Sequence, residues 1–146
     1  AMKIAAYQGG KFEVLSGRDE LMLEALAVGI KGFVGSQYNF AGDLYNEIRR
    51  SFGLDLAKAQ RLMMAAVELL DLQKAAPTGM DGTKNVFNAL NAHGGFGVSS
   101  APRVGDARVP ATPMDAAALR ALRERLRSWC GRNQDLQMCS GFPAAA

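Results

Sequence analysis

The sequence predicts an α/β fold organised around a parallel strand–helix–strand unit within residues 12–39. Two short apolar runs, at 12–16 and 32–35, are predicted as strands because glycines and polar turn residues bound them. A segment with one apolar face separates them by about 16 residues, which is enough for a helical crossover between parallel neighbours. A polar turn follows each run, and in parallel α/β units such turns hold the ligands.

The elements around this unit follow from turn and cap signals. Residues 3–7 are predicted to end a helix, which Gly9 and Gly10 terminate. Asp19 and Glu20 fall in the first turn of the crossover helix, where carboxylates suit the positive end of the helix dipole. Gly29 is a good residue to follow the last turn of that helix.

Four more helices are predicted after the second strand. Asp43 and Asp55 are expected to cap the first two, and Pro77 stops the second near residue 76. Thr83 begins the third helix, a loop occupies 98–112, and Thr112 with Pro113 is predicted to start the last helix, which runs to about Trp129. Residues 131–146 lack periodicity and are expected to drape over the fold or to fray.

Composition bounds the class of protein. The 146 residues, 49% hydrophobic and 21% charged, are typical of one soluble globular domain. A net charge of +3 does not imply nucleic-acid binding, and no apolar run is long enough to span a membrane. Cys130 and Cys139 have no metal-site spacing and are predicted to be reduced thiols in a cytoplasmic protein, and His93 cannot complete a zinc site alone.

Two parallel strands cannot form a stable sheet by themselves, because parallel strands need further neighbours and cover on both faces. The sequence therefore predicts that part of the fold is missing upstream of residue 1.

Two short motifs carry a family resemblance. Gly17-Arg18-Asp19-Glu20 follows the first strand, and Gly35-Ser36-Gln37-Tyr38-Asn39 follows the second. In this order the chain resembles the dihydrodipicolinate synthase and N-acetylneuraminate lyase family of Schiff-base aldolases. The resemblance implies the C-terminal part of a (β/α)8 TIM barrel, with strands 7 and 8 and their helices over residues 1–53. A three-helix C-terminal extension over 54–130 and an irregular tail over 131–146 would follow.

The resemblance also implies a substrate-binding rim. The Gly-Ser-x-Tyr-Asn motif is closer to the N-acetylneuraminate lyase branch, in which Gly17, Asp19 and Glu20 would hold the hydroxylated tail of a sialic acid. Gly35 and Ser36 would line the same pocket. Carboxylate acceptors and close-lying glycines suit a polyhydroxylated sugar acid. Asp19 and Glu20 are equally what a helix N-terminus prefers, Ser36 can simply start a turn, and Tyr38 is expected to pack in the core.

The catalytic residues of the family have no counterpart here. Its reaction needs a lysine on strand six that forms an imine with pyruvate and a tyrosine on strand five, and none of the six lysines lies in a suitable place. The isolated chain is therefore expected to be inactive. The complete protein would cleave N-acetylneuraminate reversibly to pyruvate and N-acetylmannosamine, with no metal or other cofactor, and would be a homo-oligomer such as a tetramer.

Other interpretations stay open. The complete enzyme could be dihydrodipicolinate synthase-like or another pyruvate-dependent aldolase. The chain could instead be a non-catalytic interaction or oligomerisation module, because open barrel faces expose apolar surface. An apolar stripe at Leu62, Met63, Leu69 and Leu70 could form a subunit contact or pack within the chain. Alternating arginines at 120–127 indicate a solvated helix face rather than a nucleic-acid site.

Overall fold

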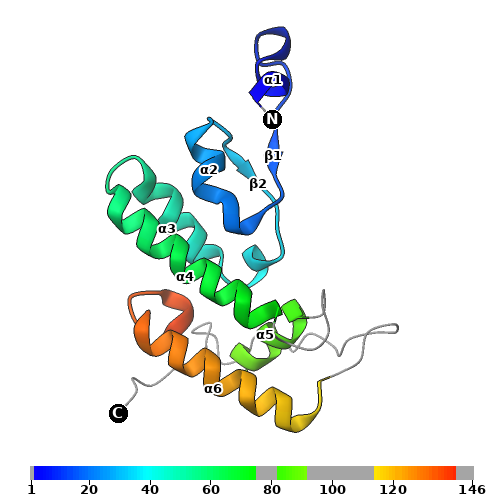
Figure 1. The fold of residues 1–146 in the computed structure, drawn as a ribbon, viewed down its shortest axis with the longest axis vertical. Helices are drawn as coiled ribbons and strands as arrows, with labels where there is room; N and C mark the ends of the chain where they lie inside the picture. The colour runs from blue at the N-terminus through cyan, green and yellow to red at the C-terminus, as the bar shows by residue number, and fades with distance from the viewer. Residues whose placement is uncertain (1, 75–81, 92–113, 141–146) are drawn as a thin grey trace. The chain divides into compact units, whose positions relative to one another are not determined.

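The computed structural model describes residues 2–74, 82–91 and 114–140, and these are mostly helical with one short pair of strands (Figure 1). The chain divides into two compact units, residues 1–67 and 68–146. In chain order the elements of the first unit are α1 (Met2–Ala5), η1 (Tyr7–Gly9), β1 (Leu15–Ser16), η2 (Asp19–Leu21), α2 (Met22–Ala27), β2 (Gly32–Phe33), η3 (Gln37–Asn39) and α3 (Gly42–Phe52). The helix α4 (Leu56–Lys74) crosses the boundary, and α5 (Gly82–Asn91), α6 (Ala116–Arg132) and η5 (Gln137–Cys139) follow in the second unit.

The two strands pair in parallel, as the sequence predicts. Leu15 lies opposite Gly32 and Ser16 opposite Phe33, and α2 provides the crossover between them. Each strand is only two residues long, so the predicted strands at 12–16 and 32–35 were too long. Within the part of the chain that the structure describes, neither outer edge of this pair meets another strand, which leaves the flanking residues without ladder partners.

Large apolar side chains of both predicted strands are exposed. Val34 is 59% exposed, and Leu15 across the pair is 58% exposed. Other large apolar side chains of the same unit are exposed as well: Met2, Ile4, Tyr7, Phe12, Leu21 and Val28. A strand pair with so much uncovered apolar surface agrees with the expectation that parallel strands need further cover.

Helix caps confirm some predictions and correct others. Asp55 caps α4, because its Oδ1 accepts the Lys58 backbone N–H at 2.9 Å. The prediction for Asp43 was wrong: α3 begins at Gly42, with Ala41 at the cap position, so Asp43 lies inside the first turn. Gly29 ends the crossover helix region with φ of +83°, a conformation that favours glycine.

The last helix also begins later than predicted. Asp115 caps α6 by accepting the Ala118 N–H at 2.7 Å, and α6 continues to Arg132 rather than ending near Trp129. The predicted starting pair Thr112–Pro113, the loop at 98–112 and His93 lie outside the described residues. The predicted helix at Thr83 is confirmed as α5, and Gln73 Nε2 donates to Thr83 Oγ1 at 2.8 Å.

Each unit has its own buried apolar side chains. In the first unit the large ones are Met22, Ile30, Phe40, Leu44, Ile48, Leu62 and Met63, and in the second they are Leu69, Leu70, Val86, Leu122, Leu126, Trp129, Leu136 and Met138. The stripe at Leu62, Met63, Leu69 and Leu70 is therefore buried within this chain. Met64, the residue after Met63, is exposed.

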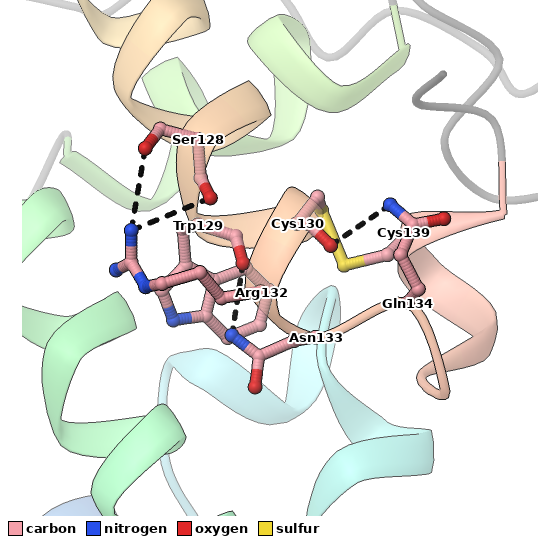
Figure 2. The surroundings of a disulfide bond; sticks show 7 residues. All are labelled: Ser128, Trp129, Cys130, Arg132, Asn133, Gln134 and Cys139. Carbon is pink, nitrogen blue, oxygen red and sulfur yellow. Dashed lines mark hydrogen bonds between the residues drawn. A yellow bond between two sulfur atoms is a disulfide. The ribbon is translucent and has the colours of Figure 1, made fainter. Parts of the chain in front are cut away.

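The cysteines are the clearest correction to the sequence analysis. Cys130 and Cys139 form a disulfide with their Cα atoms 5.1 Å apart, whereas the sequence predicted reduced thiols (Figure 2). The end of α6 and the short η5 turn bring them together, an approach that the spacing of nine residues did not reveal. Residues 133–140 drape against the helix end rather than fray, with Leu136, Met138 and Cys139 buried, and residues 141–146 lie outside the described part.

None of the described helices is long and apolar enough to cross a membrane.

Candidate functional site

The two predicted rim turns begin at the same edge of the strand pair. Because β1 and β2 are parallel and in register, the chain leaves both strands toward the same side. The Val34 N–H donates to the Ser16 carbonyl at 2.9 Å, which holds the start of the second turn beside the start of the first. Residues 17–20 and 35–37 therefore lie next to each other, as the motif positions predict.

Asp19 joins these two turns through its carboxylate. Its Oδ2 accepts the Gln37 backbone N–H at 2.9 Å and lies 3.5 Å from the donating Ser36 hydroxyl. The residue is only 5% exposed, so this link is protected from competing water. Asp19 thus ties the residues after β1 to the turn after β2.

Gly35 makes room for this carboxylate. A Cβ at position 35 would overlap the Asp19 Oδ1 and would also crowd its Cγ. Gly17 has no such constraint, because a Cβ there would find its nearest neighbour, the Val34 carbonyl oxygen, at 3.9 Å. The two glycines that the sequence grouped together therefore have different structural roles.

Burial dominates the electrostatics of Asp19. Desolvation raises the pKa of this carboxyl above its ordinary 3.8, and the nearby Glu20 charge adds to the rise, while the hydrogen bonds from Gln37 and Ser36 oppose it. Asp19 Oδ1 has no hydrogen-bond partner among the described residues. A buried acceptor without a partner is an unusual feature that a bound water or ligand hydroxyl would relieve.

Glu20 and Ser36 are the accessible polar members of the site. Ser36 is exposed, and its carbonyl accepts the Asn39 Nδ2–H at 2.9 Å, which shapes the turn. Glu20 is half-buried and pairs at 3.4 Å with Arg18, whose side chain is largely exposed. Solvent therefore reaches the side chains of Glu20 and Ser36, whereas that of Asp19 is buried.

The structure adds two residues that sequence reasoning missed, Gln37 and Tyr45. The Gln37 side chain is fully buried and its Oε1 accepts the Tyr45 hydroxyl from α3. Gln37 occupies a variable position of the motif, and Tyr45 lies beside the apolar face of its helix, so only the contact itself identifies them. This pair holds the turn whose N–H binds Asp19.

Tyr38 is half-buried rather than enclosed in the core as the sequence predicted. Its ring meets that of Tyr45 edge-on, with ring centroids 4.6 Å apart. Desolvation first, and then the charges of Asp19 and Glu20, raise the pKa of Tyr38 to about 12 and also raise that of Tyr45. Both phenols therefore stay neutral in the physiological range.

A metal site or a suitably placed lysine among the described residues would bear on the chemistry of this site. No group of three or more His, Cys, Asp or Glu side chains among them is placed to hold a metal ion. The Lys3 and Lys31 side chains are exposed, and Lys58 forms an ion pair with Glu47. Lys31 directly precedes β2 and so lies at the end of the strand opposite the rim.

A model of the dihydrodipicolinate synthetase family matches residues 1–128. The chain belongs to this family.

Two curated relatives carry the name of one branch. The chain is 35% identical over 82 residues to an N-acetylneuraminate lyase of Gallus gallus and 25% identical over 123 residues to one of Danio rerio. A sialic acid aldolase of Aliivibrio salmonicida has the same fold over 88% of this chain, with a TM-score of 0.73 and 29% identity. The matches to the two curated relatives cover 56% and 84% of this chain.

The relatives are considerably longer. The matched regions span 27% and 37% of the two curated proteins and 39% of the Aliivibrio salmonicida chain. The solved relatives are TIM-barrel aldolases of this family, so the strand pair with its helices corresponds to a part of that architecture.

Proposed function

We propose that this chain is the C-terminal, sugar-acid-binding part of a class I aldolase that forms a Schiff base with pyruvate. In the complete protein the reaction would be the reversible cleavage of N-acetylneuraminate to pyruvate and N-acetylmannosamine. Gly17, Asp19, Glu20, Gly35 and Ser36 form the rim that receives the hydroxylated tail. The names of the curated relatives support this choice within the family.

One observation supports the rim most directly. The Asp19 carboxylate binds the Gln37 N–H and lies beside the Ser36 hydroxyl, so the two motif turns form one polar surface. Glu20 offers an acceptor and Ser36 offers both a donor and an acceptor, which suits a chain of hydroxyl groups. A hydroxyl of the tail would supply the donor that the buried Asp19 Oδ1 lacks.

The first test uses the chain alone. N-Acetylneuraminate added to isotope-labelled chain should shift the backbone amide resonances of Glu20, Ser36 and Gln37, and pyruvate should leave them in place. Glu20→Ala should weaken the binding about tenfold, since it removes a hydrogen bond to a charged acceptor. Shifts scattered over the chain, or an unchanged affinity in the variant, would contradict the rim.

The second test concerns catalysis. We propose that the isolated chain does not turn over N-acetylneuraminate, because it carries no lysine placed to form the imine. Borohydride added with pyruvate should therefore leave the intact mass of the chain unchanged. A trapped pyruvyl adduct would overturn this part of the proposal and would identify an activated lysine.

The third test supplies the rest of the barrel. The chain co-expressed with the part of the Aliivibrio salmonicida aldolase that it does not cover should release pyruvate from N-acetylneuraminate. With Glu20→Ala in the chain, the release should fall while borohydride trapping of pyruvate on the partner remains. Two soluble, associated parts that release no pyruvate would argue against the assignment.

Another pyruvate-dependent aldolase, with a dihydrodipicolinate synthase-like substrate, is the second candidate, and the description of the matching family favours it. The same hybrid distinguishes the two. If Glu20 binds only the tail of a long sugar acid, Glu20→Ala should not affect short aldehydes, which do not reach the rim. Equal loss of activity on short aldehydes and on long sugar acids would therefore favour the second candidate.

A further inference from the structure

The end of α6 is held by a short segment that returns along it. Residues 133–140 reverse the chain after Arg132, and η5 places Cys139 against Cys130 (Figure 2). Cys130 belongs to the last turn of the helix, so the disulfide closes the returning segment onto the helix that precedes it.

The same segment caps the helix. Asn133 Nδ2 donates to the Trp129 carbonyl at 2.9 Å, and Gln134 Nε2 donates to the Cys130 carbonyl at 2.9 Å (Figure 2). The last carbonyls of a helix have no partner within the helix. Asn133 supplies a donor to the Trp129 carbonyl, and Gln134 adds a second donor to the Cys130 carbonyl, which also accepts the Asn133 backbone N–H at 3.0 Å. Both caps depend on the segment staying where the disulfide holds it.

The segment has little intrinsic order of its own. η5 is three residues long, and a single helical turn is unstable without tertiary support. Its buried side chains, Leu136 and Met138, supply packing, and the disulfide supplies the covalent tie. Reduction of the disulfide therefore removes a covalent constraint on this segment, and the three-residue η5 turn is too short to hold the segment in place by itself.

Cys130 and Cys139 are both fully buried. A thiol must approach a sulfur along the bond axis to exchange with a disulfide, so a reductant reaches this bond only after residues 133–140 have moved. Opening of the segment and reduction of the bond are consequently coupled events.

We propose that Cys130–Cys139 is a redox-controlled lock on residues 133–140, opened by a thiol reductant. A dithiol attacks one sulfur, the Sγ–Sγ bond breaks, and two electrons and two protons from the reductant leave two cysteine thiols and one reductant disulfide. The released segment uncovers the end of α6 and withdraws both side-chain caps. The inference concerns the second unit and does not depend on the proposed sugar-acid rim.

Trp129 is a built-in reporter for this event. It is the only tryptophan of the chain, it is 1% exposed, and it directly precedes Cys130. Dithiothreitol added to air-purified chain should shift its emission to longer wavelength. Iodoacetamide should then label both cysteines, and the thermal midpoint of the second unit should fall by about 10 °C, as expected for opening a loop of this size.

Two sets of variants test the lock. The double variant Cys130→Ser with Cys139→Ser should match the reduced chain in midpoint and should ignore dithiothreitol. Gln134→Ala should accelerate reduction, because it removes a cap that keeps the segment closed, whereas Gln137→Ala, an equal truncation at an exposed position of the same segment, should not.

If the double variant fails to fold, comparison of the oxidised and the reduced wild-type chain tests the same proposal. Two labelled thiols with unchanged emission and midpoint would overturn the proposal, since the segment would then stay in place without the bond. Free thiols in protein purified under air would overturn it as well.

Discussion

At the scale of single residues, the contact between Asp19 and Gly35 organises the candidate site. The carboxylate occupies the space that a side chain at position 35 would need. The contact between the two motif turns therefore requires a residue without a Cβ at position 35, as well as the two hydrogen bonds to Asp19.

Gly35→Ala should destabilise the first unit by about 2–3 kcal/mol, as overpacking does, because its Cβ must displace Asp19. Urea denaturation measures the change. Gly17→Ala is the matched control and should have a small effect, since its Cβ would meet nothing closer than 3.9 Å. In an Asp19→Ala background Gly35→Ala should cost much less, and additive losses in the two variants would contradict the overlap.

Asp19 should also make stability depend on pH. Burial raises its pKa above 3.8, so just above that value the folded chain holds a proton that the unfolded chain has lost. The free energy of unfolding should therefore fall as the pH rises from 3.8 through the folded pKa.

Asp19→Asn should remove that part of the decline, because an amide does not ionise. Denaturation at a series of pH values for both chains gives the difference. Asp71→Asn, at an exposed position, is the control and should follow the wild-type curve. Parallel curves for Asp19→Asn and wild type would mean that Asp19 titrates alike in the folded and unfolded states.

Tyr45→Phe should destabilise the chain by about 1–2 kcal/mol, because it leaves the buried Gln37 Oε1 without its hydrogen-bond donor. The same variant should broaden the Gln37 backbone amide resonance, since the turn loses its support. Tyr7→Phe, which removes an exposed hydroxyl, should leave both measurements unchanged.

At the scale of elements, helix capping separates what the sequence could predict from what it could not. Asp55 stands directly before a long periodic segment, and the structure confirms its cap. Asp43 and Thr112 have equally good chemistry, but α3 begins at Gly42 and α6 is capped by Asp115. Several acceptable cap residues near one boundary compete, and tertiary packing decides which is used.

The two observed caps can be compared directly. Asp55→Ala and Asp115→Ala should each lower the free energy of unfolding by about 1 kcal/mol, because each leaves a helix N–H without an acceptor. Denaturation followed by circular dichroism measures the loss. Glu13→Ala, at an exposed position outside the helices, is the control, and a loss as large as those at the caps would point to a general charge effect.

The candidate site was predictable to the extent that it follows from strand order. Motifs after two parallel strands must meet at one edge, so the closeness of Asp19 and Ser36 could be expected. The Gln37–Tyr45 contact and the disulfide could not, because each depends on side-chain directions that periodicity does not specify.

At the scale of the whole molecule, the uncovered strand pair is the main physical liability. Leu15 and Val34 are each more than half exposed, and the outer edges of the pair meet no further strand within the described residues. Exposed apolar surface next to unpaired strand edges favours association.

The isolated chain should therefore self-associate as its concentration rises, and sedimentation velocity should show this. Val34→Lys should reduce the association, because a charge on the apolar face must be desolvated in any contact. Gln60→Lys adds the same charge at an exposed position of α4 and should not. Equal effects of the two substitutions would mean that net charge, rather than this surface, controls association.

The contact between positions 19 and 35 also constrains the order in which this sequence can change. A side chain at 35 is disfavoured for as long as an aspartate stands at 19, and becomes acceptable once that aspartate is gone. Loss of the acid can precede loss of the glycine, but the reverse order passes through an unstable intermediate. Descendants of this chain should therefore keep both residues, or lose the aspartate first.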